Sequence, residues 1–111
     1  MSPRGRDALA DILTAIRRVQ GFPIPDRETF LASDVLQDAV VRNLEIIGEA
    51  TKRLSDSCRQ QHPLIPRREM AGMRDVLIHA YDQIDLEEVW MAYQRFPEIR
   101  RQVTDILEKS G

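Results

Sequence analysis

The stretch DVLQDAVVRNLEIIGEATKRLS, residues 34–55, decides the fold that the sequence predicts. Its apolar residues recur at the three- and four-residue spacing of a helix and form two adjacent stripes. The first stripe holds Leu36, Val40, Leu44, Ile47 and Leu54, and the second holds Val35, Ala39, Ile46 and Ala50. An apolar arc this wide indicates burial on two sides, against the helix's own bundle and against a second subunit. The stretch therefore predicts the long helix of an all-α protein that dimerises.

The remaining face of this helix carries a row of charged residues at three- and four-residue spacing: Asp38, Arg42, Glu45, Glu49 and Lys52. The simpler interpretation is a solvent-exposed face with an ion pair between Asp38 and Arg42. A part in a functional site is the alternative, and periodicity by itself leaves both open.

Proline, glycine and polar residues divide the rest of the chain into further helices. These are expected over about residues 6–20 and 66–80, after Asp82, and from Pro97 toward the C-terminus. The helix after Asp82 has the spacing of a capping box at Asp85 and Glu88 and is expected to continue to Phe96, where Pro97 ends or kinks it. The prediction is one domain over residues 1–111, an up-and-down bundle of about five helices.

Composition limits the class of protein. Hydrophobic residues make up 42% and charged residues 31% of the chain, and no apolar run approaches the roughly 20 residues of a membrane span. The N-terminal residues also lack the apolar core of a secretory signal, so we expect a cytoplasmic protein without membrane contact. The formal net charge of −2 is not typical of a protein that binds nucleic acid by charge alone.

Cysteine and histidine are scarce. Cys58 is the only cysteine, which excludes an internal disulfide, and His62 and His79 are the only histidines. Because no ligand cluster of metal-binding spacing accompanies them, we expect neither a metal nor a cofactor.

Residues 72–81, GMRDVLIHAY, place three functional side chains on one predicted helix. Arg74 and Tyr81 lie at the edge of its apolar stripe, whereas His79 lies on the opposite face, one turn after Asp75. The simpler interpretation is a surface histidine near a helix C-terminus, favoured by the helix dipole and by Asp75. The alternative is a site for phosphate chemistry, because arginine binds phosphate and histidine exchanges a proton near neutral pH.

Such a pair suits metal-free cleavage of RNA, in which the 2′-hydroxyl attacks the adjacent phosphate. On a straight helix, however, Arg74 and His79 lie roughly 140° apart around the axis and about 7.5 Å apart along it. They converge only if the helix unwinds or if two copies of the motif face each other across a two-fold axis. A symmetric dimer would supply two histidines, one as base and one as acid.

The pattern Arg74-x4-His79-x-Tyr81 resembles the signature of the HEPN superfamily, specifically its HepT-like toxin branch. The blocks RNLEIIGEATKRL (42–54), HPLIPRREMAGMRD (62–75) and DLEEVW (85–90) resemble that branch in the same order and spacing. The resemblance implies a small helical ribonuclease whose dimer joins two motifs in one cleft, and which acts as the toxin of a toxin–antitoxin pair. It also implies a partner, a minimal nucleotidyltransferase antitoxin that inactivates the toxin by adding AMP to the motif tyrosine.

Carried over by position, the resemblance makes Arg74 and His79 the catalytic pair and Tyr81 the modification site. It gives supporting roles, in orienting Arg74 or binding the partner, to Arg42, Asn43, Glu45 and Glu49. Trp90, Tyr93 and Phe96, whose spacing is simply helical, are expected in the core or the dimer interface.

Two positions depart from the family pattern. Asp75 stands where many relatives have asparagine, and it either orients His79 or weakens RNA binding. Arg67 stands where relatives often have tryptophan, and with Arg68 and Arg74 it forms a local basic strip, in which Arg67 and Arg68 are predicted to bind RNA. A non-catalytic dimer that binds a nucleotide or docks the nucleotidyltransferase is the alternative function, and a purely structural dimer leaves the motif unexplained.

Overall fold

A computed structural model describes residues 2–55 and 85–109 of the chain, and every regular element in these residues is a helix. The helices are α1 (Pro3–Gln20), α2 (Arg27–Leu31), α3 (Asp34–Lys52), α6 (Leu86–Gln94) and α7 (Phe96–Lys109). The predicted all-α class is therefore confirmed. The helix expected over residues 66–80, which carries the motif, lies outside the described residues.

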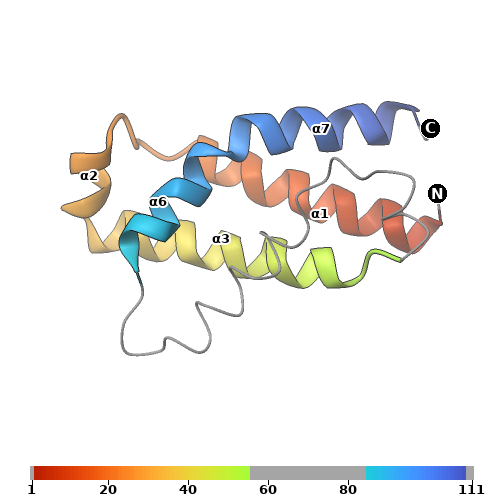
Figure 1. The fold of residues 1–111 in the computed structure, drawn as a ribbon, viewed down its shortest axis with the longest axis horizontal. Helices are drawn as coiled ribbons and strands as arrows, with labels where there is room; N and C mark the ends of the chain where they lie inside the picture. The colour runs from red at the N-terminus through yellow and green to blue at the C-terminus, as the bar shows by residue number, and fades with distance from the viewer. Residues whose placement is uncertain (1, 56–84, 110–111) are drawn as a thin grey trace.

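The helices form an up-and-down bundle, as the sequence predicted (Figure 1). α1 lies between α3 and α7, packs against both and runs antiparallel to both. α2 packs against α3 and α6 at the end of the bundle where α1 finishes, and α6 leads directly into α7. The core between α1 and α3 is built from aliphatic side chains: Leu9, Ile12, Ile16, Val19, Val40, Leu44 and Ile47.

Side-chain caps explain where the long helices begin. α1 starts at Pro3, earlier than the expected residue 6, because Ser2 Oγ accepts a hydrogen bond from the N–H of Gly5 at 3.1 Å. Proline suits this first position, where its missing N–H would have had no partner within the helix. α3 starts after Ser33, whose Oγ accepts from the N–H of Leu36 at 3.2 Å, and ends at Lys52 rather than residue 55.

The cap predicted at Asp85 is confirmed. Its Oδ1 accepts hydrogen bonds from the N–H groups of Glu87 at 3.0 Å and Glu88 at 3.4 Å, which starts α6. α6 ends at Gln94, and Phe96 begins α7 rather than ending α6 as expected. Pro97 lies in the first turn of α7, where a proline does not interrupt the helical hydrogen bonds.

Helix α2 was missed, because the sequence predicted no helix between residues 21 and 34. Asp26 caps it, with Oδ1 accepting from the N–H of Thr29 at 2.8 Å. The hydrogen bonds with the backbone and side chain of Thr29 hold the pKa of the Asp26 carboxyl below its ordinary value of 3.8. Phe30 is fully buried, with its ring centroid 5.6 Å from that of Trp90. A helix of five residues is too short for a periodic pattern, so tertiary packing decides its presence.

The two apolar stripes predicted on α3 differ in burial. Along the first stripe Val40, Leu44 and Ile47 are buried, as expected. Along the second stripe Ala50 is buried, Ala39 and Ile46 are half-buried, and Val35 is 77% exposed. Burial on two sides is therefore incomplete within one chain, and the contact with a second subunit stays a prediction.

Candidate functional site

The structure describes the α3 part of the predicted site. Arg42, Asn43, Glu45 and Glu49 all lie within α3. The remaining site residues, Arg67, Arg68, Arg74, Asp75, His79 and Tyr81, lie outside the described residues. Their roles in catalysis, modification and RNA binding stay predictions.

The charged row on α3 faces outward, as the simpler interpretation predicted. The side chain of Arg42 is 72% exposed, and Glu49 is also exposed. Arg42 Nη1 lies 3.9 Å from Glu45 Oε2, so the ion pair is made with Glu45 rather than with the expected Asp38. Both spacings bring side chains to one helix face, and an exposed pair of this kind adds little stability. The row therefore presents charge at the surface and contributes little to packing.

Asn43 differs from the other three supporting residues because it points into the bundle. It is only 5% exposed, and its Nδ2 donates a hydrogen bond to the carbonyl oxygen of Ala39 at 2.8 Å. Its Oδ1 is buried and meets no hydrogen-bond donor among the described residues. A buried acceptor without a donor costs about 1–3 kcal/mol, so its presence calls for an explanation beyond packing.

Thr51, the other buried polar residue of α3, provides a comparison. Its Oγ1 donates to the carbonyl oxygen of Ile47 at 2.7 Å, a bond that lies entirely within the helix. Thr51 therefore needs no partner outside α3, whereas the acceptor oxygen of Asn43 does. The sequence placed Asn43 among the supporting residues, but its spacing did not separate it from the exposed row.

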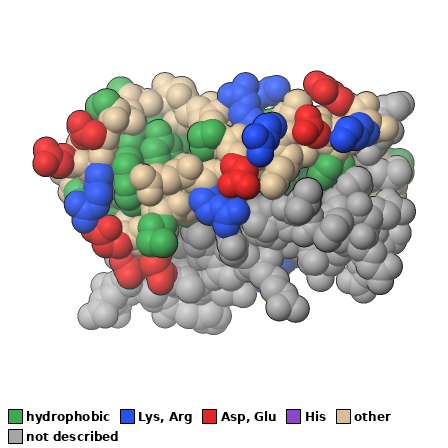
Figure 2. All heavy atoms as spheres, turned by 45° about the horizontal axis from the view of Figure 1, so that its top comes forward, with side chains coloured by type: hydrophobic (Ala, Val, Ile, Leu, Met, Phe, Trp, Pro, Cys, Tyr) green, Lys and Arg blue, Asp and Glu red, His purple; other side chains and the backbone are tan. Residues whose placement is uncertain are grey.

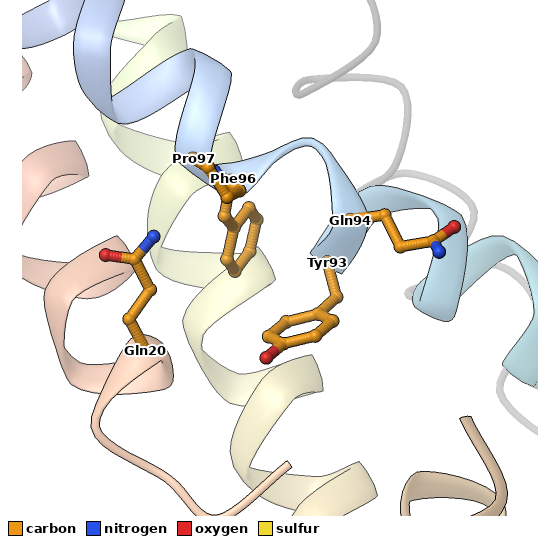
Figure 3. Close-up of a pocket in the computed structure, with 5 residues that line it drawn as sticks. All are labelled: Gln20, Tyr93, Gln94, Phe96 and Pro97. Atoms are coloured by element: carbon orange, nitrogen blue, oxygen red, sulfur yellow. The ribbon is translucent and has the colours of Figure 1, made fainter. Parts of the chain in front are cut away.

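A hollow that the sequence did not predict opens where α1 ends and α6 meets α7 (Figure 3). It has a volume of about 100 Å³ and is lined by Gln20, Tyr93, Gln94, Phe96 and Pro97. In the close-up, Gln20 and Gln94 lie on opposite sides of the two aromatic rings. Tyr93 is half-buried and Phe96 is buried, as predicted for core residues, but Tyr93 also borders the hollow.

Over residues 2–55 and 85–109, no three histidine, cysteine, aspartate or glutamate side chains gather as metal ligands. None of the helices in these ranges is both long and apolar enough to cross a membrane.

Comparison with known proteins decides the family. Residues 12–106 match the family model described as "Ribonuclease HepT-like". The chain belongs to the HepT-like ribonuclease family. The resemblance carried by the motif is thereby confirmed, and so is the predicted class, an endoribonuclease.

Curated relatives of the HepT-like family match over most of their length. A putative RNase of Caldanaerobacter subterraneus subsp. tengcongensis is 43% identical over 95 residues, which cover 85% of this chain and 82% of that protein. A probable ribonuclease HepT of Thermococcus cleftensis is 46% identical over 86 residues, 77% of this chain and 78% of that one. A putative RNase of Methanocaldococcus jannaschii is 39% identical over 102 residues, 90% and 88% of the two chains. No solved structure gives a significant match.

Proposed function

We propose that this protein is a metal-independent endoribonuclease and the toxin of a type VII-like toxin–antitoxin pair. Its membership of the HepT-like ribonuclease family over residues 12–106 carries the proposal. The Arg74-x4-His79-x-Tyr81 pattern supplies the groups that the chemistry needs. In this proposal two subunits bring their motifs together in one cleft, and a minimal nucleotidyltransferase acts as the antitoxin.

The proposed reaction is an internal transfer at phosphorus. Arg74 holds the phosphate with its planar fork of N–H donors. His79 of one subunit takes the proton of the 2′-hydroxyl, whose oxygen forms a new bond to the phosphorus. The bond from phosphorus to the 5′-oxygen breaks, and the second histidine protonates that oxygen. The products are a 2′,3′-cyclic phosphate and a 5′-hydroxyl, so the step uses no water and no metal.

The α3 residues divide into two proposed roles. Asn43 has a buried acceptor oxygen without a donor among the described residues, and we assign it to orienting Arg74 by accepting an N–H from its guanidinium. Arg42, Glu45 and Glu49 lie on the outer face of the helix, where charges act on association with a partner rather than on folding. Arg67 and Arg68 are proposed to contact RNA phosphates, and Asp75 to orient His79.

The first test is cleavage of a labelled RNA by the purified protein in excess EDTA. We expect cleavage to persist with the chelator present, and the 5′ fragments to end in 2′,3′-cyclic phosphate, because the 2′-hydroxyl is the nucleophile. Fragments ending in 3′-hydroxyl, or activity that appears only when Mg²⁺ is added, would contradict the mechanism, since metal-activated water leaves a different end.

The second test concerns the proposed antitoxin, and it measures the intact mass of the protein after co-expression with that nucleotidyltransferase. We expect whole-AMP increments that vanish in Tyr81→Phe, because the phenol oxygen is the proposed acceptor. Tyr93→Phe is the matched control, since the chain has two tyrosines and the Tyr93 hydroxyl lies 3.4 Å from the carbonyl oxygen of Ile24. Increments that survive in Tyr81→Phe, or disappear in Tyr93→Phe, would count against Tyr81 as the site.

The net charge of −2 favours one alternative, a non-catalytic dimer that binds a nucleotide or docks the nucleotidyltransferase. A comparison of wild type with His79→Ala distinguishes the two functions. Tight antitoxin binding by wild type and His79→Ala alike, without cleavage of any RNA by wild type, supports the docking module.

A further inference from the structure

A shallow groove runs between α1 and α7, away from the charged row of α3. It has a volume of about 400 Å³ and is lined by Arg6, Leu13, Arg17, Thr104, Leu107 and Glu108. Positions 6, 13, 17 and 20 of α1 are seven, four and three residues apart, so they lie along one side of the helix. Because Gln20 borders the hollow of Figure 3, the groove and the hollow follow the same side of α1. At 1.5 Å per residue, the distance from Arg6 to Gln20 is about 21 Å.

Two arginines, Arg6 and Arg17, line the groove, and Arg100 lies beside its Gln20 end. Arg6 Nη1 donates to the carbonyl oxygen of Leu107 at 3.3 Å, and Arg100 Nη1 donates to Gln20 Oε1 at 2.5 Å. Each guanidinium has five N–H donors, so both arginines keep donors for a ligand. Arg17 is exposed and makes no ion pair with a described residue, and Glu108 is the one acidic residue that lines the groove.

The charge on this side of the molecule is mixed. On the face shown in Figure 2, acidic and basic side chains are interspersed, with some of the basic ones near the middle of the upper edge. A strip of arginines within a mixed surface attracts phosphate at that strip without a strong field around the whole molecule.

The hollow at the end of the groove has the chemistry of a base-binding pocket. The ring of Tyr93 lies 5.2 Å from that of Trp90 and 5.9 Å, edge to face, from that of Phe96. The Tyr93 hydroxyl donates a long hydrogen bond to the carbonyl oxygen of Ile24 at 3.4 Å. Aromatic surface suits stacking of an unpaired base, and the side-chain amides of Gln20 and Gln94 offer donors and acceptors for its edge.

We propose that the α1–α7 groove is an accessory site for single-stranded RNA, with arginines on the phosphates and one base in the hollow beside Tyr93. This accessory site depends on the proposed function in one respect, that RNA is the substrate. The binding surface is built from α1, α6 and α7, whereas the predicted catalytic motif is residues 72–81 of the sequence. An acidic peptide would satisfy the arginines but would leave the aromatic and amide groups of the hollow without a use, so RNA is the better match.

The test measures binding without cleavage, using a fluorescein-labelled 2′-O-methyl oligouridylate, which lacks the free 2′-hydroxyl that attacks phosphorus. Arg17→Gln removes a charge from the groove, and Arg18→Gln removes the same charge from the adjacent position, which does not line it. We expect Arg17→Gln to weaken binding several-fold and to reduce the slope of log affinity against log salt by about 0.7, one phosphate contact. Arg18→Gln should match wild type. Equal effects of the two variants, or none from Arg17→Gln, would overturn the groove as the site.

A second measurement addresses the base pocket. Trp90 is the only tryptophan, and its ring centroid lies 5.2 Å from that of Tyr93, which borders the hollow, so its emission reports on the hollow. We expect the oligouridylate to change this emission more than an abasic strand of the same length, and poly-glutamate of equal charge to compete poorly. Equal emission changes, or equal competition, would show a site that recognises charge alone and would overturn the proposal. Neither readout involves cleavage, so a failure of the proposed ribonuclease chemistry would leave the result interpretable.

Discussion

The His79→Ala protein is expected to lose RNA cleavage by a factor of about 10²–10⁴, the usual contribution of a positioned acid or base. In the proposed dimer the loss falls at the upper end of that range or beyond it, because one substitution removes both the base and the acid of the shared cleft. Initial cleavage rates on a single labelled RNA measure the effect. Growth arrest on expression should disappear in parallel.

His62→Ala is the matched control, since His62 and His79 are the only histidines of the chain. It should cleave RNA at the wild-type rate, and both variants should keep the helical circular dichroism and thermal unfolding of wild type. A cleavage rate that is preserved in His79→Ala would contradict the mechanism.

Mixing subunits then distinguishes a shared cleft from two independent sites. If each cleft needs a histidine from both subunits, exchange with excess His79→Ala protein lowers the activity of a fixed amount of wild type in proportion to the wild-type fraction. Independent sites would leave that activity unchanged, and this outcome would remove the dimeric cleft from the proposal.

The Phe30→Ala protein is expected to lose about 3–5 kcal/mol of unfolding free energy, the typical cost of removing a buried phenylalanine ring. Phe30 is fully buried and packs 5.6 Å from Trp90, so its truncation leaves a cavity between α2 and α6. A domain of this size is stable by about 5–15 kcal/mol, which makes the loss a large share of the total. Thermal unfolding followed by circular dichroism should show a midpoint lower by about 10 °C or more.

Val35→Ala is the matched control, because it also removes apolar side-chain atoms, near the start of α3. Because Val35 is 77% exposed, the change should stay within about 0.5 kcal/mol. A Phe30→Ala midpoint equal to that of wild type would show that α2 unfolds separately from the bundle and contributes nothing to its stability.

Some features of the candidate site follow from the sequence, and others do not. The exposed charged row of α3 follows from spacing, because three- and four-residue steps return to one helix face. The partner of Arg42 does not follow, since Asp38 and Glu45 both satisfy that spacing and only side-chain placement selects Glu45. The burial of Asn43 could not be predicted either, because a hydropathy pattern treats every polar residue as exposed.

The sequence by itself determined the all-helical class, the positions of α1, α3, α6 and α7, and the family. Periodic apolar residues and caps such as Asp85 act within a few residues of chain, so a local pattern contains them. The family follows from the order of residues along the chain, and recognising it needs no coordinates.

The tertiary structure decided what depends on residues far apart in the chain. It placed α2 through the contact of Phe30 with Trp90, and it brought Arg53, the residue after α3, within 2.5 Å of Asp11 on α1. It also set α7 beside α1 and so created the groove that Arg17 lines. Each of these features needs two segments whose adjacency comes from burial of the whole core, and burial is a property of the assembled bundle rather than of any one helix.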